Sequence, residues 1–268
     1  MTIQQTKGTA LITGASTGIG AVYADRLARR GFDLILVARD LQKLDALAVR
    51  LRKETGRAVS TLKADLTVAE DLRTVERRLA EDSRITMLVN NAGVGATAPL
   101  LESKAEDLDR MISLNVVALT RLTHAAAPGF VARGNAAIIN IASIVAIAPE
   151  VLNGSYGGSK AYVLALTQSM HKELGDKIRV QAVLPGATST AFWDVAGTPV
   201  QYLPQEIVMT AEDMVDAALA GLDQGEVVTI PSLPDLAEWE RFNAARMEMA
   251  ARLSRATPAA RYLPENAQ

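Results

Sequence analysis

The chain has 268 residues, of which 49% are hydrophobic and 22% charged, and its formal net charge at pH 7 is −2. This is the composition of an ordinary globular protein, and the near-neutral charge predicts neither nucleic acid nor an anionic membrane as a partner. The chain has no cysteine, which excludes disulfides and thiolate chemistry, and its 2 histidines leave so little material that we expect no metal site.

Apolar runs alternate with helical patterns along the whole chain. Runs such as 34–37 and 137–141 lack polar alternation, which is typical of strands buried on both faces of a parallel sheet. We expect strands at 9–13, 33–38, 58–63, 86–90, 136–142, 178–184 and 226–230. We expect helices at 19–30, 41–54, 68–82, 104–132, 155–174, 211–223 and 235–255. This order predicts a single doubly wound, Rossmann-type α/β domain over residues 1–268, with a seven-stranded parallel sheet and helices on both faces.

Two segments depart from the regular alternation. Residues 187–210 form a long connection, which we interpret as a substrate loop, and residues 232–268 form a C-terminal helical extension. The polar start, residues 1–7, predicts no signal peptide, and no apolar run approaches the roughly 20 residues that a membrane helix needs. We therefore expect a cytoplasmic protein.

A glycine-rich turn follows the first expected strand directly. Its sequence is Gly14-Ala15-Ser16-Thr17-Gly18-Ile19-Gly20. Strand, glycine turn and helix together make a phosphate-binding corner, because glycines let backbone N–H groups approach a pyrophosphate and the helix N-terminus favours its negative charge. The spacing G-x-x-x-G-x-G differs from the commoner dinucleotide fingerprint G-x-G-x-x-G. We expect the cofactor to be held here by Gly14, Ser16, Thr17, Gly18, Ile19 and Gly20.

A tyrosine and a lysine stand four residues apart in the helix expected over 155–174. On a helix, Tyr156 and Lys160 share a face. The ammonium is expected to lower the pKa of the phenol from its ordinary value of about 10, so that the tyrosine can exchange a proton with an alcohol or carbonyl oxygen near neutral pH. Taken alone, the spacing also fits a surface tyrosine beside a solvated lysine.

Further motifs stand in the same order and at the same separations as in a known family. They are Asn90-Asn91-Ala92-Gly93, Asn115, Ser143 at thirteen residues before Tyr156, and Pro185-Gly186 with Thr190. With the glycine turn and the Tyr–Lys pair, they resemble the short-chain dehydrogenase/reductase family over residues 7–231. The resemblance implies an NAD(P)-dependent oxidoreductase acting on CH–OH and C=O groups, and it leaves the substrate open.

The resemblance also implies roles for four catalytic residues. Tyr156 is the acid/base, and Lys160 tunes it and binds the nicotinamide ribose hydroxyls. Ser143 hydrogen-bonds the substrate oxygen, with a helix-cap or loop serine as the alternative. Asn115 holds a water that links Lys160 to solvent, with a purely structural hydrogen bond as the alternative.

Other matching segments are implied to border the cofactor. Asp65 and Leu66 correspond to the pair that contacts adenine, although Asp65 would also serve as the N-cap of the next helix. The remaining implied cofactor-binding residues are Asn91, Ala92, Gly93, Pro185, Gly186, Thr188 and Thr190.

The end of the second expected strand indicates the choice of cofactor. The aspartate typical of NAD enzymes in this family would fall at Ala38, and Arg39 follows it, where a guanidinium can pair with a 2′-phosphate. Ser16 and Thr17 add no basic residue in the glycine turn, where many NADP enzymes of the family carry one. We favour NADP(H), with NAD(H) possible.

These observations predict an NADPH-dependent carbonyl reductase, or the reverse alcohol dehydrogenase, acting on an apolar ketone, aldehyde or secondary alcohol. A dinucleotide-sensing regulator without turnover is the alternative. We expect a homodimer or homotetramer. The apolar pocket is predicted at Ala146, Ile147, Val151, Leu152, Phe192 and Trp193.

Overall fold

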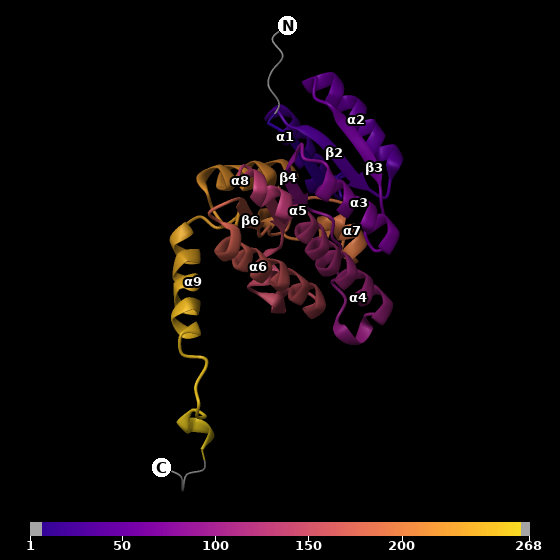
Figure 1. The fold of residues 1–268 in the computed structure, drawn as a ribbon. Coiled ribbons are helices and arrows are strands. Elements are labelled where there is room, and N and C mark those ends of the chain that lie inside the picture. The colour runs from indigo at the N-terminus through magenta and orange to yellow at the C-terminus, as the bar shows by residue number, and fades with distance from the viewer. Residues whose placement is uncertain (1–6, 264–268) are drawn as a thin grey trace. The chain divides into compact units, whose positions relative to one another are not determined.

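A computed structural model describes residues 7–263, so most of the polar start and the last five residues of the expected extension lie outside it. The centre is a sheet of seven parallel strands in the order β3-β2-β1-β4-β5-β6-β7 (Figure 1). This confirms the doubly wound fold expected from the sequence. The strands are β1 Thr9–Thr13, β2 Asp33–Ala38, β3 Val59–Lys63, β4 Ile85–Asn90, β5 Ala137–Ile141, β6 Arg179–Val183 and β7 Val228–Thr229.

Helices cover both faces of this sheet (Figure 1). The helices of the α/β body are α1 Gly18–Arg29, α2 Leu41–Thr55, α3 Ala69–Glu81, α4 Ala105–Ile112, α5 Leu119–Arg133, α6 Gly154–Leu174, α7 Phe192–Ala196 and α8 Ala211–Gln224. A further helix, α9 Leu236–Ala250, belongs to a separate unit. One core cluster joins α1, α2 and α8 to the sheet around the fully buried Tyr23. A second joins α3, α5 and α6 to the other face around the fully buried Phe130. Every residue of β1 and β5 is buried, which accounts for their unbroken apolar sequences.

The ends of the expected elements lie within two residues of the observed ones except in the last helix, but the last strand is shorter than expected and one helix is interrupted. The last strand was expected over 226–230, and only Val228–Thr229 pairs with β6. It is an edge strand, and short edge strands leave few unpaired backbone groups. The helix expected over 104–132 is interrupted by a π-helical segment, Ser113–Ala118, between α4 and α5. Asn115 lies in that segment with its side chain buried, so the irregular turn coincides with a residue of the expected site.

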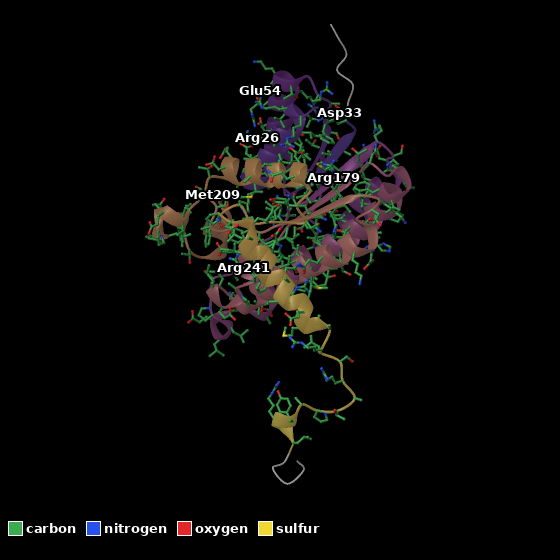
Figure 2. All side chains as sticks on the ribbon, turned by 90° about the vertical axis from the view of Figure 1, so that its left-hand side faces the viewer. Arg26, Asp33, Glu54, Arg179, Met209 and Arg241 are labelled. Carbon is green, nitrogen blue, oxygen red and sulfur yellow. The ribbon has the colours of Figure 1, made fainter. Side chains whose placement is uncertain are left out.

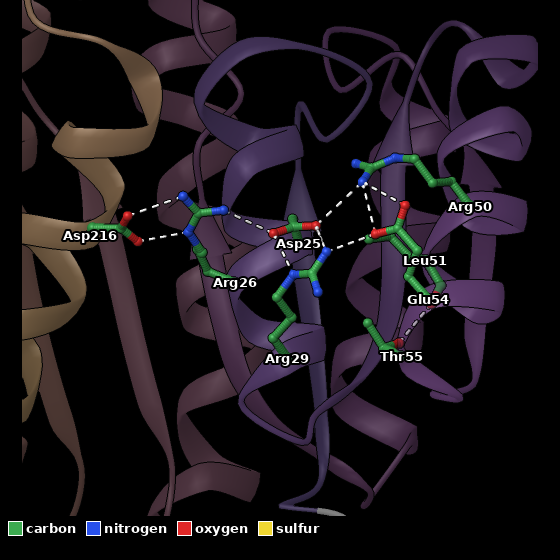
Figure 3. Close-up of polar contacts among 8 residues, drawn as sticks. All are labelled: Asp25, Arg26, Arg29, Arg50, Leu51, Glu54, Thr55 and Asp216. Carbon is green, nitrogen blue, oxygen red and sulfur yellow. Dashed lines mark hydrogen bonds and ion pairs between the residues drawn. The ribbon is translucent and has the colours of Figure 1, made fainter.

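A network of ion pairs joins the helices on one face of the sheet (Figure 3). Asp25 on α1 is 7% exposed and accepts hydrogen bonds from Arg26 at 2.9 Å and from Arg29 at 3.0 Å. Arg26 also donates to Asp216 on α8 at 2.7 Å, and Arg29 also donates to Glu54 on α2 at 2.7 Å. Burial alone would raise the pKa of Asp25, but the hydrogen bonds from Arg29 and Arg26 reverse this effect and hold the pKa below its ordinary value.

We expect Asp25→Ala to lower the free energy of unfolding by about 3 kcal/mol, because it leaves neighbouring guanidiniums without their buried partner. Asp216→Ala is the matched control: that carboxylate is 54% exposed, and its removal should cost less than about 1 kcal/mol. Urea denaturation measures both variants. Since the pKa of Asp25 is lowered, the difference between parent and Asp25→Ala should shrink as the pH falls. Equal losses in the two variants at pH 7 would contradict this account.

A boundary between Pro231 and Ser232 separates a second, small unit from the α/β body. It contains α9, which begins at the N-cap Asp235 and ends at Ala250, five residues before the expected end. No residue of α9 is buried. The ring centroids of Trp239 and Phe242 lie 5.6 Å apart, with the two planes tilted by 34°. Arg241 lies on this helix (Figure 2). Within residues 7–263, no helix combines the length and apolarity required to cross a bilayer.

Candidate active site

The glycine turn forms a corner that only glycine can build at two positions. Gly14 has φ of +64°, and a Cβ there would lie 2.8 Å from the side-chain nitrogen Nδ2 of Asn91. A Cβ on Gly20 would lie 2.5 Å from the same nitrogen. Asn91 fixes the turn by donating to the backbone oxygens of Thr13 at 2.9 Å and Gly14 at 3.1 Å. The loop after β4 is therefore bonded directly to the turn after β1.

This corner fits the pyrophosphate of a dinucleotide. Helix α1 begins at Gly18 with no side-chain cap and no acidic residue in its first turn, so its N-terminal N–H groups and dipole favour an anion. Thr17 is exposed, and Ser16 and Ile19 are partly exposed beside it. A Cβ on Gly18 would lie 3.1 Å from the methyl of Thr190, which places the segment after β6 against the same turn.

Tyr156 lies in the first turn of α6, and Asn153 holds that turn. The carboxamide oxygen of Asn153 accepts from the backbone N–H of Ser155 at 3.0 Å and of Tyr156 at 3.3 Å. Its amide donates to the oxygen of Ala98 at 2.6 Å. Asn153 was missed by the sequence reasoning, although an asparagine just before a helical run is a standard N-cap signal.

The expected effect of Lys160 on Tyr156 is wrong for this structure. Tyr156 is 5% exposed, and burial raises the pKa of its phenol to about 12, while a hydrogen bond with Ser143 lowers it by a smaller amount. Lys160 is 6% exposed, and burial lowers the pKa of its ammonium to about 8. Its Nζ donates to the oxygen of Ile141 at 2.9 Å and lies 5.8 Å from the centroid of the Tyr156 ring. Removal from water is therefore the largest influence on the pKa of both groups.

Ser143 has the cap role that was given as its alternative, and its hydrogen bond to a substrate oxygen stays a prediction. It lies two residues after the end of β5, and its hydrogen bond with Tyr156 lowers the pKa of that phenol. It also caps a short 3₁₀ turn by accepting from Val145 N at 3.4 Å, and it donates to the oxygen of Pro185 at 3.4 Å. The bond to Pro185 joins the segment after β5 to the Pro185-Gly186 segment after β6.

Asn115 is fully engaged with protein groups. It donates to the oxygen of Val94 at 2.8 Å and accepts from the N–H of the same residue at 3.0 Å. It also donates to Ser159 Oγ at 3.1 Å. A Cβ on Gly93 would lie 3.1 Å from Asn115 Oδ1 and 3.5 Å from Lys160 Nζ, so the small residue at 93 allows these polar groups to approach each other. The structural alternative for Asn115 is thus supported, and its water-holding role stays a prediction.

The residues expected at the adenosine end lie after β2 and β3. Arg39 is exposed and is among the charges that act on Asp65. Asp65 is not the N-cap of α3, which is Val68; instead it accepts from Thr67 N at 3.0 Å and Thr67 Oγ1 at 2.7 Å. The side chain of Leu66 is 6% exposed and packs in the core.

The connection over residues 187–210, which was expected to be a substrate loop, is bonded to its own start. Thr188 pairs with Met209, a residue marked in Figure 2, and accepts through its backbone oxygen from the indole of Trp193 at 2.9 Å. Of the six residues expected to line an apolar pocket, Leu152 and Phe192 pack with Tyr156 in one cluster. Val151 is 62% exposed, and Trp193 is 8% exposed. A surface hollow of about 480 Å³ lies elsewhere, between α3 and α5, and none of the expected site residues lines it.

Fold and site define the class of protein as a dinucleotide-dependent oxidoreductase that acts on hydroxyl and carbonyl groups. A family profile described as short chain dehydrogenase matches residues 8–199, and the chain belongs to the short-chain dehydrogenase/reductase family.

Solved structures and a curated relative agree with this assignment. A short-chain dehydrogenase from Sphingobium yanoikuyae in complex with NADPH is 51% identical, with a TM-score of 0.93 over 96% of this chain and 100% of that one. A bulky-bulky ketone specific alcohol dehydrogenase from Comamonas testosteroni is 46% identical, with a TM-score of 0.89 over 97% of this chain and 100% of that one. Human 17-beta-hydroxysteroid dehydrogenase type 3 is 33% identical over 78% of this chain, which spans 66% of the human protein's length.

Proposed function

We propose that this protein is an NADPH-dependent carbonyl reductase, or alcohol dehydrogenase in the reverse direction, acting on bulky apolar ketones. The observation that carries the proposal is the buried Tyr156, hydrogen-bonded to Ser143 and one helical turn from the buried Lys160. A phenol whose pKa is raised to about 12 is protonated at neutral pH, and the reduction of a carbonyl needs such a proton donor. The similarity to the Comamonas ketone-specific enzyme supports the choice of substrate class.

The chain's own residues account for binding and for proton transfer. When bound, the nicotinamide cofactor supplies hydride. The glycine turn and the N-terminus of α1 would hold its pyrophosphate, and Lys160 would hold the nicotinamide ribose hydroxyls. Ser143 would orient the carbonyl oxygen, and Tyr156 would donate its hydroxyl proton to that oxygen. The ammonium of Lys160 would then stabilise the phenolate left behind, which is where its charge contributes most.

Turnover is favoured over a sensing role. A sensor needs the cofactor corner but has no need of a buried acid beside a buried base. The test is a panel of aryl and alkyl ketones with NADPH, followed by loss of NADPH absorbance and by chromatography of the alcohols. Reduction of several ketones is expected. NADPH binding without any alcohol formed would favour the sensor.

We propose that Arg39 selects NADPH by pairing with its 2′-phosphate. The double change Ala38→Asp with Arg39→Leu removes the cation and supplies a carboxylate, which repels the phosphate and accepts from a ribose hydroxyl. We expect the preference for NADPH over NADH to fall by roughly ten- to a hundred-fold, the scale of a charge-assisted hydrogen bond. Fluorescence titration with both reduced cofactors measures it.

Lys53→Leu, which removes an exposed charge from α2, is the control and should leave the preference unchanged. If the parent bound NADH as tightly as NADPH, Arg39 would be a solvated surface charge and this assignment would be wrong.

A further inference from the structure

Phe192 is the aromatic residue that packs directly against the proposed acid. Its ring centroid lies 5.8 Å from that of Tyr156, with the two planes tilted by 45°. On another side it meets the ring of Trp193 edge-on, with centroids 5.6 Å apart. Phe192 is partly buried, so part of its side chain remains accessible. An apolar group attached to a carbonyl at Tyr156 would therefore contact this ring.

Gly95 makes room for the Phe192 ring. A Cβ on Gly95 would collide with Cζ of that ring and would lie 2.8 Å from Cε2 and 3.1 Å from Cε1. Gly95 is not among the glycines with a positive φ, so its backbone would accept alanine without strain. The absence of a side chain at 95 is thus required by the ring of Phe192 and not by the path of the backbone.

Helix α7, which carries Phe192, is bonded to the same β4 loop. Thr97 donates to the oxygen of Ala196 through its N–H at 3.1 Å and through its hydroxyl at 2.7 Å. Thr198 donates to Thr97 Oγ1 at 3.2 Å. These bonds tie the end of α7 to the loop after β4. A methyl group on residue 95 would therefore displace the Phe192 ring more readily than the helix. Trp193 closes one side of the Phe192 ring, and Tyr156 borders another.

We infer that Phe192 is a specificity-determining residue, and that Gly95 is a positioning residue that acts through it by setting how far the Phe192 ring reaches into the substrate space. This inference rests on the proposed ketone reductase activity and adds the residues that limit the size of the group beside the carbonyl.

The test compares acetophenone, a compact aryl ketone, with benzophenone, a bulky one. Gly95→Ala is expected to lower kcat/KM for benzophenone about tenfold more than for acetophenone, because the displaced ring occupies the space of the second phenyl group. Phe192→Ala is expected to raise KM for acetophenone about tenfold with kcat changed only a few-fold, because a stacking contact is lost and the proton donor is untouched.

The double variant Gly95→Ala/Phe192→Ala provides the decisive comparison. Without the ring, the added methyl has nothing to strike, so the double variant should behave like Phe192→Ala alone. Gly158→Ala is the matched control, since a Cβ there meets nothing within 4 Å, and it should leave the ratio of the two ketones unchanged. A Gly95→Ala effect that persisted in full without Phe192, or an unchanged ratio in every variant, would overturn the inference.

Binding without turnover separates this inference from the proposed function. Calorimetric titration of the NADPH-loaded protein with benzhydrol, a pair that cannot exchange hydride, should show weaker binding in Gly95→Ala than in the parent. The double variant should bind benzhydrol as Phe192→Ala alone does. A parent chain that reduced neither ketone would count against the proposed function and leave this coupling measurable. Failure of the parent to bind benzhydrol would overturn the inference itself.

Discussion

Tyr156→Phe is expected to reduce the turnover of a ketone by at least about a hundredfold, the usual scale of a positioned acid/base group. The change removes one oxygen and keeps the ring, so the packing against Phe192 and the core around Met111 and Val145 should persist. Cofactor affinity should change less than about threefold, because the glycine turn and Lys160 are untouched. Stopped-flow reduction and fluorescence titration measure the two quantities separately.

Tyr162→Phe on the same helix is the matched control. Tyr162 is 38% exposed, and its hydroxyl bonds to Thr120 on α5 at 2.8 Å. Its removal should leave turnover within about twofold, because the group lies outside the site. Turnover of Tyr156→Phe within a few-fold of the parent would show that another group supplies the proton.

Lys160→Met is expected to reduce turnover by at least about tenfold and to weaken cofactor binding as well, because one ammonium serves both. Burial lowers the pKa of Lys160 to about 8, so the parent should lose reduction rate as the pH rises through about 8. The phenol of Tyr156, with its pKa raised to about 12, keeps its proton over that range. The loss near pH 8 should be absent in Lys160→Met.

The lowered pKa of Lys160 also determines how the free energy of unfolding changes with pH. Between about 8 and the ordinary lysine value of 10.5, the unfolded chain binds the proton that the folded chain has lost, so the free energy of unfolding should rise with pH. Lys160→Met should lack this rise. Lys172→Met, at an exposed position of α6, should keep both the pH profile and the rise. A normal profile and normal cofactor affinity in Lys160→Met would make Lys160 a bystander.

Features that depend on local sequence were predictable. The glycine turn follows a strand and begins a helix, and each part has its own pattern, so the corner could be placed from Thr9 to Gly20 without tertiary information. The Tyr–Lys spacing fixed a shared helix face in the same way. The seven-stranded sheet followed from unbroken apolar runs, which only burial on both faces explains.

Features that depend on contacts between distant segments were not predictable. The predicted direction of the Tyr156 pKa shift was wrong because burial of the phenol raises its pKa. Burial depends on how distant segments pack around the site, and the Tyr–Lys spacing along the helix gives no information about it. The π-helical turn at Asn115 coincides with a bond to Val94, 21 residues earlier. Gly95 gave no signal as a lone glycine in a loop, since its role depends on Phe192, which lies far along the chain.

The central claim is that this chain transfers hydride from NADPH to a ketone carbon while Tyr156 protonates the oxygen. The most direct measurement uses NADPH carrying deuterium at both C4 positions of the nicotinamide, with benzophenone as substrate and mass spectrometry of the alcohol. The account predicts benzhydrol with deuterium on the carbinol carbon, formed in proportion to the NADPH consumed and suppressed in Tyr156→Phe. Alcohol without deuterium, or NADPH consumed with no alcohol formed, would contradict it.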